Sequence, residues 1–287
     1  MKEVASTPEP LRVHPSYRLA VCQLEPVFRD CEANLRKMED QARRAAMAGA
    51  ELVIFPECSL TGYGPGALVE RMVEAAEPAT GPERAPSVRR LEALSAELCT
   101  WIIFGMAEKT DRGVYNSSLL VSPWQGVVGV YHKSHMWDCE GKFFEPGEAF
   151  RVYDTPLGRL GMLICFDLEF PEAGRILSLA GAQLLAVSTA NMRPWEEYQR
   201  VYARARAMEN GVFVAVANRL GFAGETDFFG GSIIVDPYGN VLAEAGRSEA
   251  VLTADIDLGL IDRAMAGCNY FEKRRPDLYG PLVRSPR

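Results

Sequence analysis

The amino-acid sequence predicts a single α/β domain, and three observations support this fold class. Short apolar segments with high β propensity alternate with helical segments along the chain. No low-complexity linker divides the 287 residues into separate units. A strand–helix–strand pattern occurs twice: "RLAVCQ" (18–23) and "AGAELVIF" (48–55) flank one helix, and "RLGMLIC" (159–165) and "AGAQLLAV" (180–187) flank another. This repeat predicts two related βαβ units and therefore two similar sheets.

The individual elements are predicted in the following order. Residues 1–16 form a Pro-rich arm that is expected to be poorly ordered. Apolar runs predict strands at 18–24, 51–55, 101–107, 115–121, 127–131, 159–165, 183–188, 212–217, 231–235 and 250–255. Helices are predicted at 32–48, 85–98 and 195–209, and the last of these places Trp195, Tyr198, Tyr202 and Ala205 on one face.

The composition excludes several classes of protein. Hydrophobic residues make up 48% of the chain and charged residues 24%, as in an ordinary globular domain. The net charge of −7 argues against a nucleic-acid-binding surface, because phosphate contacts need clustered Lys and Arg. No apolar run approaches the roughly 20 residues that span a bilayer. The N-terminus has no apolar signal core, so we expect a cytoplasmic protein.

The cysteines and histidines do not suggest a metal or a disulfide framework. The chain has seven cysteines, an odd number, and no Cys-x-x-Cys pair. His132 and His135 are three residues apart, but they fall where a strand gives way to a loop, and no third ligand is evident nearby. We therefore predict that the protein needs neither a metal nor a cofactor.

Three reactive side chains follow predicted strands. Glu57 follows strand 51–55, Lys133 follows strand 127–131, and Cys165 ends strand 159–165. Ligands of open α/β folds bind outside the carboxyl ends of strands. A thiol needs a base or a positive charge nearby to act as a nucleophile, and a buried carboxylate can be that base. A lysine can stabilise both the thiolate and the oxyanion of a tetrahedral intermediate, so these three residues suffice for acyl transfer.

Three motifs in this order resemble those of the nitrilase superfamily, the carbon–nitrogen hydrolases. They are "LVIFPECSLTGY" (52–63), "YHKSHMWDCEGKFFEPG" (131–147) and "LICFDLEFPE" (163–172). The resemblance implies that Glu57 is the general base, Lys133 the oxyanion-stabilising residue, Cys165 the nucleophile and Glu140 a supporting carboxylate.

The resemblance also has implications for the fold and the assembly. It implies a four-layer α-β-β-α sandwich formed by residues 17–276, followed by a C-terminal tail at 277–287. It further implies a homodimer, or a higher homo-oligomer, paired through the helix after the nucleophile.

Four further residues are candidates for substrate binding. The backbone N–H of Phe166 can complete an oxyanion hole, while its ring is expected to pack. Tyr63 and Trp137 are close in sequence to catalytic positions and are expected either to wall the pocket or to pack in the core. Asn191 follows strand 183–188 and is expected to face the site.

The function predicted from these residues is hydrolysis of a small carboxamide to a carboxylic acid and ammonia through a thioester. The alternatives are an N-carbamoyl amine or amino-acid amidohydrolase, a nitrilase, and a binding or redox protein without turnover. True nitrilases of the superfamily typically continue with Trp-Glu after the nucleophile, whereas this chain continues with Phe166-Asp167. Arg193 could bind a substrate carboxylate, or could form a salt bridge at the surface or in a dimer, which is the interpretation we favour. Glu169 would repel such a carboxylate or neutralise Arg193, so we predict a small neutral amide.

Overall fold

The computed structural model describes residues 14–284, which form two six-stranded sheets, a small hairpin and six α-helices. The first sheet contains β1 (Ser16–Gln23), β2 (Leu52–Ile54), β3 (Trp101–Thr110), β4 (Gly113–Ser122), β5 (Gly126–His132) and β14 (Ala250–Asp257). The second contains β6 (Val152–Thr155), β7 (Gly158–Ile164), β8 (Leu184–Thr189), β9 (Phe213–Asn218), β12 (Ile233–Val235) and β13 (Val241–Glu244). The separate hairpin is β10 (Leu220–Ala223) and β11 (Thr226–Phe229). The helices are α1 (Cys31–Met47), α2 (Leu68–Val73), α3 (Pro86–Leu98), α4 (Pro171–Leu179), α5 (Glu196–Asn210) and α6 (Gly259–Gly267).

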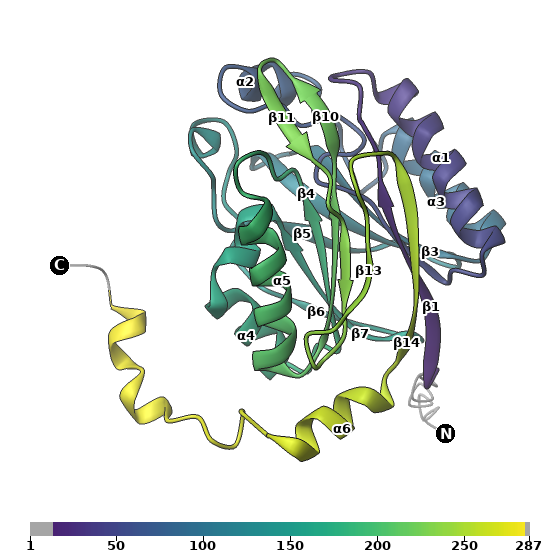
Figure 1. The fold of residues 1–287 in the computed structure, drawn as a ribbon. Helices are drawn as coiled ribbons and strands as arrows, with labels where there is room; N and C mark the ends of the chain where they lie inside the picture. Colours follow the sequence, from purple (N-terminus) through teal and green to yellow (C-terminus); the bar gives the residue numbers. More distant parts are fainter. Residues whose placement is uncertain (1–13, 285–287) are drawn as a thin grey trace, which may run out of the picture.

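The sheets and helices stack in four layers, which confirms the predicted fold. Helices α1 and α3 cover the first sheet on one side of the molecule, and α4 and α5 cover the second sheet on the other (Figure 1). Between the two sheets lies a core to which both contribute, with Leu19 and Ile54 from the first and Leu160 and Ala186 from the second. Burying apolar side chains on both faces of each sheet fits the parallel strands at the sheet centres.

The two sheets have the same strand pattern, as the sequence repeat predicts. Their spatial orders are β14-β1-β2-β3-β4-β5 and β6-β7-β8-β9-β12-β13. In each order the first pair is antiparallel, the next two pairs are parallel and the last two are antiparallel. The register also matches, because Leu19 pairs with Leu52 in the first sheet and Leu160 with Leu184 in the second.

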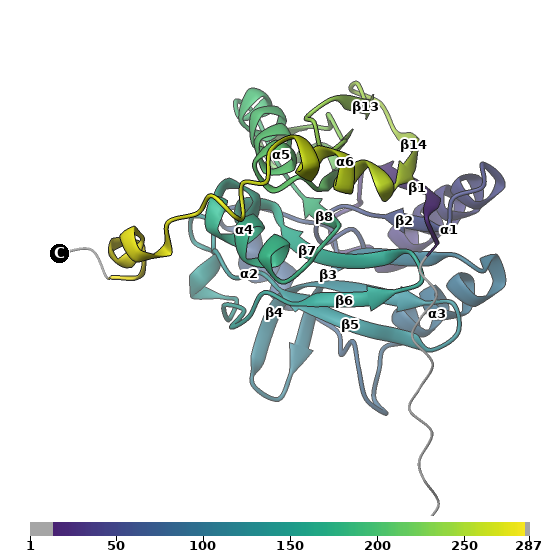
Figure 2. The same ribbon diagram turned by 90° about the horizontal axis from the view of Figure 1, so that it is seen from below.

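Several elements were not expected from the sequence. Strands β6, β10, β11 and β13 have only four residues each, which is too short to show a periodic pattern. Helix α2 is also short, and α6 presents no buried residue that would mark an amphipathic stripe. Strand β1 begins at Ser16, so the described structure begins inside the expected arm of residues 1–16, whose residues 1–13 lie outside the described part. Beyond α6 the chain runs away from the sandwich through two 3₁₀ turns, Pro276–Leu278 and Gly280–Val283 (Figure 2), and residues 285–287 of the expected tail lie outside the described part.

The aromatic residues predicted on one face of α5 do share a face, since the Trp195 ring contacts Tyr198 and the Tyr198 ring contacts Tyr202, but this face is partly exposed. Trp195 and Tyr198 are 38% and 48% exposed, and the buried face instead carries small and polar residues such as Gln199, Ala203 and Arg206. Gln199 donates to the Gly231 carbonyl, and Arg206 donates to the Leu168 carbonyl. Polar side chains lie on the inner face because they satisfy loop carbonyls, and hydrophobic periodicity does not report such a role.

Within residues 14–284 no helix is long and apolar enough to cross a membrane. All seven cysteines are unpaired.

Candidate active site

Cys165 lies on a sharp turn at the carboxyl end of β7. It adopts a positive φ of 46°, which is unusual for a residue with a side chain, and it begins the 3₁₀ helix Cys165–Glu169. Asp167 stabilises this turn, because its carboxylate accepts a hydrogen bond from the Ile164 N–H at 3.1 Å. Backbone strain of this kind persists where the surroundings over-determine it, and it is common at active sites.

Asp167 also connects the Cys165 turn to the loop that carries Lys133. Its carboxylate accepts from the Tyr131 hydroxyl at 2.7 Å and from the His135 N–H at 2.9 Å, and His135 Nδ1 lies 2.8 Å from it. The Asp167 side chain is fully buried. Asp167 was not among the sequence candidates, although its place two residues after the cysteine is the kind of local capping position that short polar residues favour.

Lys133 lies between two buried carboxylates. Its Nζ is 3.0 Å from Glu57 Oε1 and 2.9 Å from Glu140 Oε1, and all three side chains are at most 1% exposed. Glu57 follows β2, Lys133 follows β5, and Glu140 begins the 3₁₀ turn Glu140–Lys142. The structure therefore brings Glu57 to Lys133 and Glu140, which are seven residues apart but distant from Glu57 in sequence, and the cluster has one more carboxylate than ammonium.

Neighbouring polar groups position these carboxylates. The Asn116 side chain donates to Glu57 Oε1 at 2.7 Å from the middle of β4. The Tyr63 hydroxyl donates to Glu140 Oε1, and the Trp137 backbone N–H donates to Glu140 Oε2, both at 2.8 Å. Asn116 was missed because an asparagine within a strand has no local sequence signature.

Burial and charge set the protonation of the cluster. Burial raises the pKa of Glu57, and Glu140 raises it further, while Lys133 and the Asn116 hydrogen bond oppose this. Burial alone would lower the pKa of Lys133, but Glu140 and Glu57 outweigh it and raise that pKa well above its usual range. Burial and the charge of Glu57 raise the pKa of the Cys165 thiol. Both shifts favour a charged lysine and a neutral thiol in the resting site.

A cavity of about 100 Å³ opens above Cys165. Its lining consists of two of the catalytic candidates, Lys133 and Cys165, together with aromatic, apolar and polar side chains: Tyr63, Trp137, Phe166, Glu169, Asn191, Met192 and Trp195. All four residues predicted to bind substrate are in this set. Met192 and Trp195 were not predicted to line the cavity. Met192 follows β8 in an irregular segment where residue spacing does not indicate direction, and Trp195 was assigned only to one face of the predicted helix 195–209. Glu57 and Glu140 lie behind the cavity wall.

Arg193 does not line this cavity. Its guanidinium pairs with Glu196 and Asp227, each at 3.2 Å, and its side chain is 51% exposed. The surface ion pair is therefore what the structure contains, and Arg193 does not neutralise Glu169 as the prediction of a neutral substrate assumed.

His132 and His135, three residues apart, have separate carboxylate partners. His132 Nε2 lies 2.9 Å from Glu108, whereas His135 lies against Asp167. Within residues 14–284 no three His, Cys, Asp or Glu side chains are grouped as metal ligands.

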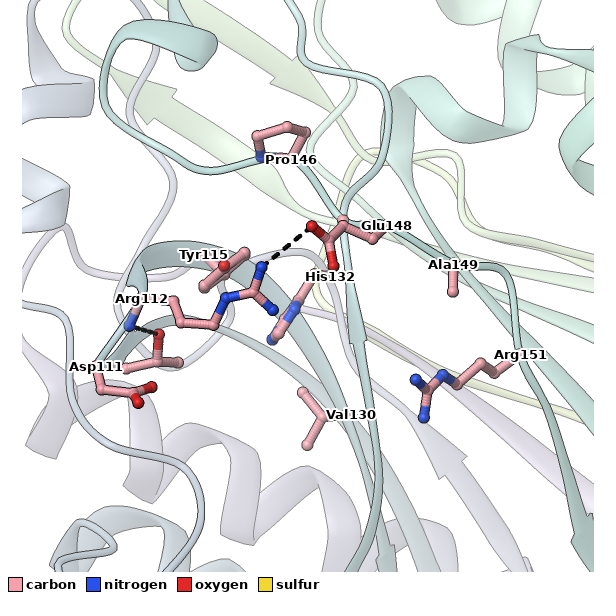
Figure 3. A pocket seen from close by; sticks show the side chains of 11 residues that line it. Asp111, Arg112, Tyr115, Val130, His132, Pro146, Glu148, Ala149 and Arg151 are labelled. Atoms are coloured by element: carbon pink, nitrogen blue, oxygen red, sulfur yellow. Dashed lines mark hydrogen bonds and ion pairs between the residues drawn. The ribbon is translucent and has the colours of Figure 1, made fainter.

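A second pocket of about 300 Å³ lies near the β3–β4 turn and the end of β5 (Figure 3). Arg112 and Glu148 form an ion pair across it at 3.1 Å, and the His132 ring stacks on Tyr115. No cysteine, serine or lysine lines this pocket, so it lacks the thiol and ammonium groups that line the cavity above Cys165.

Comparison with known proteins points to the same chemistry. Residues 18–265 match the family model described as carbon-nitrogen hydrolase. A protein of Schizosaccharomyces pombe described as a probable nitrilase is 34% identical over 92% of this chain and 98% of its own. An (R)-stereoselective amidase of a Pseudomonas species is 36% identical over 84% of this chain and 86% of its own.

Solved structures agree with the relatives. The crystal structure of an amidase from a Nesterenkonia species superposes with a TM-score of 0.81 at 28% identity, covering 96% of this chain and 99% of that one. In a variant of that amidase, acrylamide has added to the active-site cysteine.

Proposed function

This chain belongs to the carbon–nitrogen hydrolase family, and we propose that it is a cysteine amidase that converts a small carboxamide into a carboxylic acid and ammonia. The observation that carries the proposal is the placement of Cys165 and Lys133 on one cavity, with Glu57 3.0 Å from the Lys133 ammonium. A nucleophile, a cation for the oxyanion and a buried carboxylate with a raised pKa are the groups that amide hydrolysis requires.

The first half-reaction forms a thioester. The Cys165 sulfur attacks the amide carbon while its proton passes to Glu57, and the oxygen gains negative charge near Lys133 and the Phe166 N–H. The carbon–nitrogen bond then breaks, and the nitrogen leaves as ammonia with the proton from Glu57. The raised pKa of Glu57 suits this carboxyl group for both accepting and returning a proton.

The second half-reaction releases the acid. Water gives a proton to Glu57 and adds to the thioester carbon, and the same two donors stabilise the second oxyanion. The carbon–sulfur bond breaks, and the sulfur regains its proton from Glu57. Glu140, which contacts Lys133 at 2.9 Å, keeps the ammonium in place through both halves.

The test is a panel of primary amides, nitriles and N-carbamoyl compounds with ammonia as the readout. We expect ammonia from primary amides, and intact-protein mass spectrometry is expected to find an acyl adduct on the Cys165 peptide. Ammonia release from nitriles alone, or an adduct only on another cysteine, contradicts the proposal. We also expect activity to survive EDTA, and activity lost in EDTA and restored by zinc would contradict that expectation.

The N-carbamoyl amino-acid alternative is tested with Arg193→Ala. An acidic substrate needs a cation, and Arg193 already pairs with Glu196 and Asp227. Wild-type protein that prefers the acidic substrate, and loses that preference by ~1.5–3 kcal/mol in the variant, would favour the alternative.

We further propose a homodimer that pairs through α4. Ile176 and Leu179 on this helix are 46% and 44% exposed, and Val201 and Met208 on neighbouring α5 are 49% and 43% exposed. Burying these side chains against a second copy removes apolar surface from water. Sedimentation at micromolar concentration should give a species of at least twice 31.7 kDa, and a monomer would contradict the proposal. Cytoplasmic residence stays a prediction, with which unpaired cysteines are consistent.

A further inference from the structure

Glu169 is the one carboxylate that faces the substrate cavity, and it has no partner there. It lies at the end of the 3₁₀ helix that Cys165 begins, and its side chain is half-buried in the cavity lining. Within the described residues 14–284 its carboxylate takes part in no hydrogen bond or ion pair. A half-buried carboxylate without a partner loses hydration without compensation, so its surroundings favour a cation.

The cations nearest to Glu169 are already engaged. The Arg206 guanidinium donates hydrogen bonds to the backbone of this turn, to the Leu168 carbonyl at 3.0 Å and to the Glu169 carbonyl at 2.8 Å. Its remaining nitrogen pairs with Glu209 at 3.1 Å. Lys133 lies between two carboxylates of its own. Arg206 and Lys133 therefore act on Glu169 only through space, and neither forms an ion pair with its carboxylate.

The remaining cavity wall suits an organic cation. Trp137, Phe166 and Trp195 line it with aromatic rings, and the faces of such rings attract ammonium groups. The only charged side chains in the lining are Lys133 and Glu169, and the charge of Lys133 is offset by Glu57 and Glu140. The cavity as a whole is thus negative, which disfavours acidic substrates.

We propose that the substrate is a short primary amide that carries an ammonium group, which Glu169 binds while Cys165 attacks the amide carbon. This inference rests on the proposed amidase function and deepens it. Glu169 follows Cys165 by four residues of 3₁₀ helix, so their backbones are separated by about 8 Å along its axis. That span places the ammonium at the far end of a short acyl chain, and the cavity of about 100 Å³ limits the size of that chain.

The experiment compares three amides of matched chain length: pentanamide, 5-aminopentanamide and the monoamide of pentanedioic acid. They are neutral, cationic and anionic, and kcat/KM for ammonia release is measured for each. We expect the cationic amide to exceed the neutral one by about tenfold or more, the effect of one charged hydrogen bond, and the anionic amide to be the poorest. Equal or lower kcat/KM for the cationic amide would overturn the inference while leaving the amidase function intact.

The matched variants are Glu169→Gln and Glu197→Gln. Glu169→Gln keeps the shape of the side chain and removes its charge. The ratio of kcat/KM for the cationic amide to kcat/KM for the neutral amide should therefore fall about tenfold. Glu197 is an exposed carboxylate in the first turn of α5, outside the cavity lining, and its replacement should leave the ratio unchanged. An unchanged ratio in Glu169→Gln would overturn the assignment of Glu169 as the residue that binds the ammonium group.

Binding to Cys165→Ala protein separates this inference from the amidase proposal. Calorimetry with the same three amides needs no turnover, and it should rank the cationic amide tightest. Tight binding of the cation without ammonia release by the wild type would contradict the amidase function alone. Absence of any preference for the cation in binding would overturn the inference alone.

Discussion

The two halves of the sandwich share a strand pattern but place different chemistry at matching positions. Because Leu19 and Leu160 occupy equivalent places in the register, Cys165 of the second half corresponds to Leu24 of the first. By the same register Glu57 of the first half corresponds to Thr189 of the second. The two segments touch, since the Glu57 N–H donates to the Thr189 carbonyl at 3.4 Å.

This difference shows that a repeated scaffold does not produce a repeated site. The carboxyl ends of the central strands of both sheets meet, so each half contributes one strand end to a single cavity. The first half supplies Glu57, the proposed base, after its second strand, and the second half supplies Cys165, the proposed nucleophile, after its first strand. The corresponding positions, Leu24 and Thr189, are buried residues that lack these reactive groups.

The largest expected effect comes from removing the nucleophile of the second half. Cys165→Ala should fold normally and lose turnover by about 10⁴-fold or more, because no thioester can form. The matched control is Cys22→Ala, a buried thiol in β1 of the first half, which should keep its activity. Ammonia release by Cys165→Ala above about a hundredth of the wild-type rate would rule out the covalent mechanism.

Removing the proposed base, Glu57 of the first half, should produce a smaller loss of activity that affects both half-reactions. Glu57→Gln cannot accept the thiol proton or activate water, so we expect acylation and deacylation each to slow by about 10²-fold or more. Rapid-quench mass spectrometry with a good substrate should show an acyl adduct on Cys165 that decays slowly. Deacylation at the wild-type rate would mean that another group activates water.

The pH profile tests the support that Asn116 gives to Glu57. The Asn116 hydrogen bond favours the charged carboxylate and so lowers the pKa of Glu57, which burial raises. Asn116→Leu removes that hydrogen bond, so the pKa should rise. Since the base acts in its deprotonated form, the acid limb of kcat/KM should move to higher pH by about one unit.

The control for this shift is the next residue of the same strand. Ser117 points to the other face of β4 and hydrogen-bonds Glu108, so Ser117→Ala should leave the acid limb in place. If the acid limb of kcat/KM in Asn116→Leu stays at the wild-type pH, Glu57 is not the group whose titration sets that limb.

The smallest effect concerns packing rather than chemistry. Ala20 of β1 corresponds to Gly161 of β7, and a Cβ at Gly161 would lie 3.0–3.2 Å from the Leu177 side chain of α4. Gly161→Ala should lower the free energy of unfolding by about 1 kcal/mol through overpacking and keep activity. Urea unfolding measures this change, and an equal or greater stability than wild type would show that α4 shifts freely.

The long, strongly patterned elements and the catalytic candidates could be predicted from sequence. The repeat predicted two similar sheets, and the shared register of Leu19–Leu52 and Leu160–Leu184 confirms it. Strand ends are readable because apolar runs stop abruptly, which is how Glu57, Lys133 and Cys165 were located. The nitrilase-superfamily resemblance added Glu140, which has no strand pattern of its own.

Other features depend on contacts that have no local signature. Asn116 and Asp167 hydrogen-bond residues distant in sequence. Arg193 forms its surface ion pair with Asp227, a residue of strand β11 that lies 34 positions further along the chain.

The sequence by itself determined the set of reactive groups and the alternation of strands and helices, because both depend on residue type and on spacing along the chain. What only the tertiary structure decided was which charges meet. Lys133 gains two carboxylates, Arg193 is held away from the cavity, and Glu169 is left facing it without a partner. Electrostatic interactions depend on separation in space and on burial, and chain position determines neither.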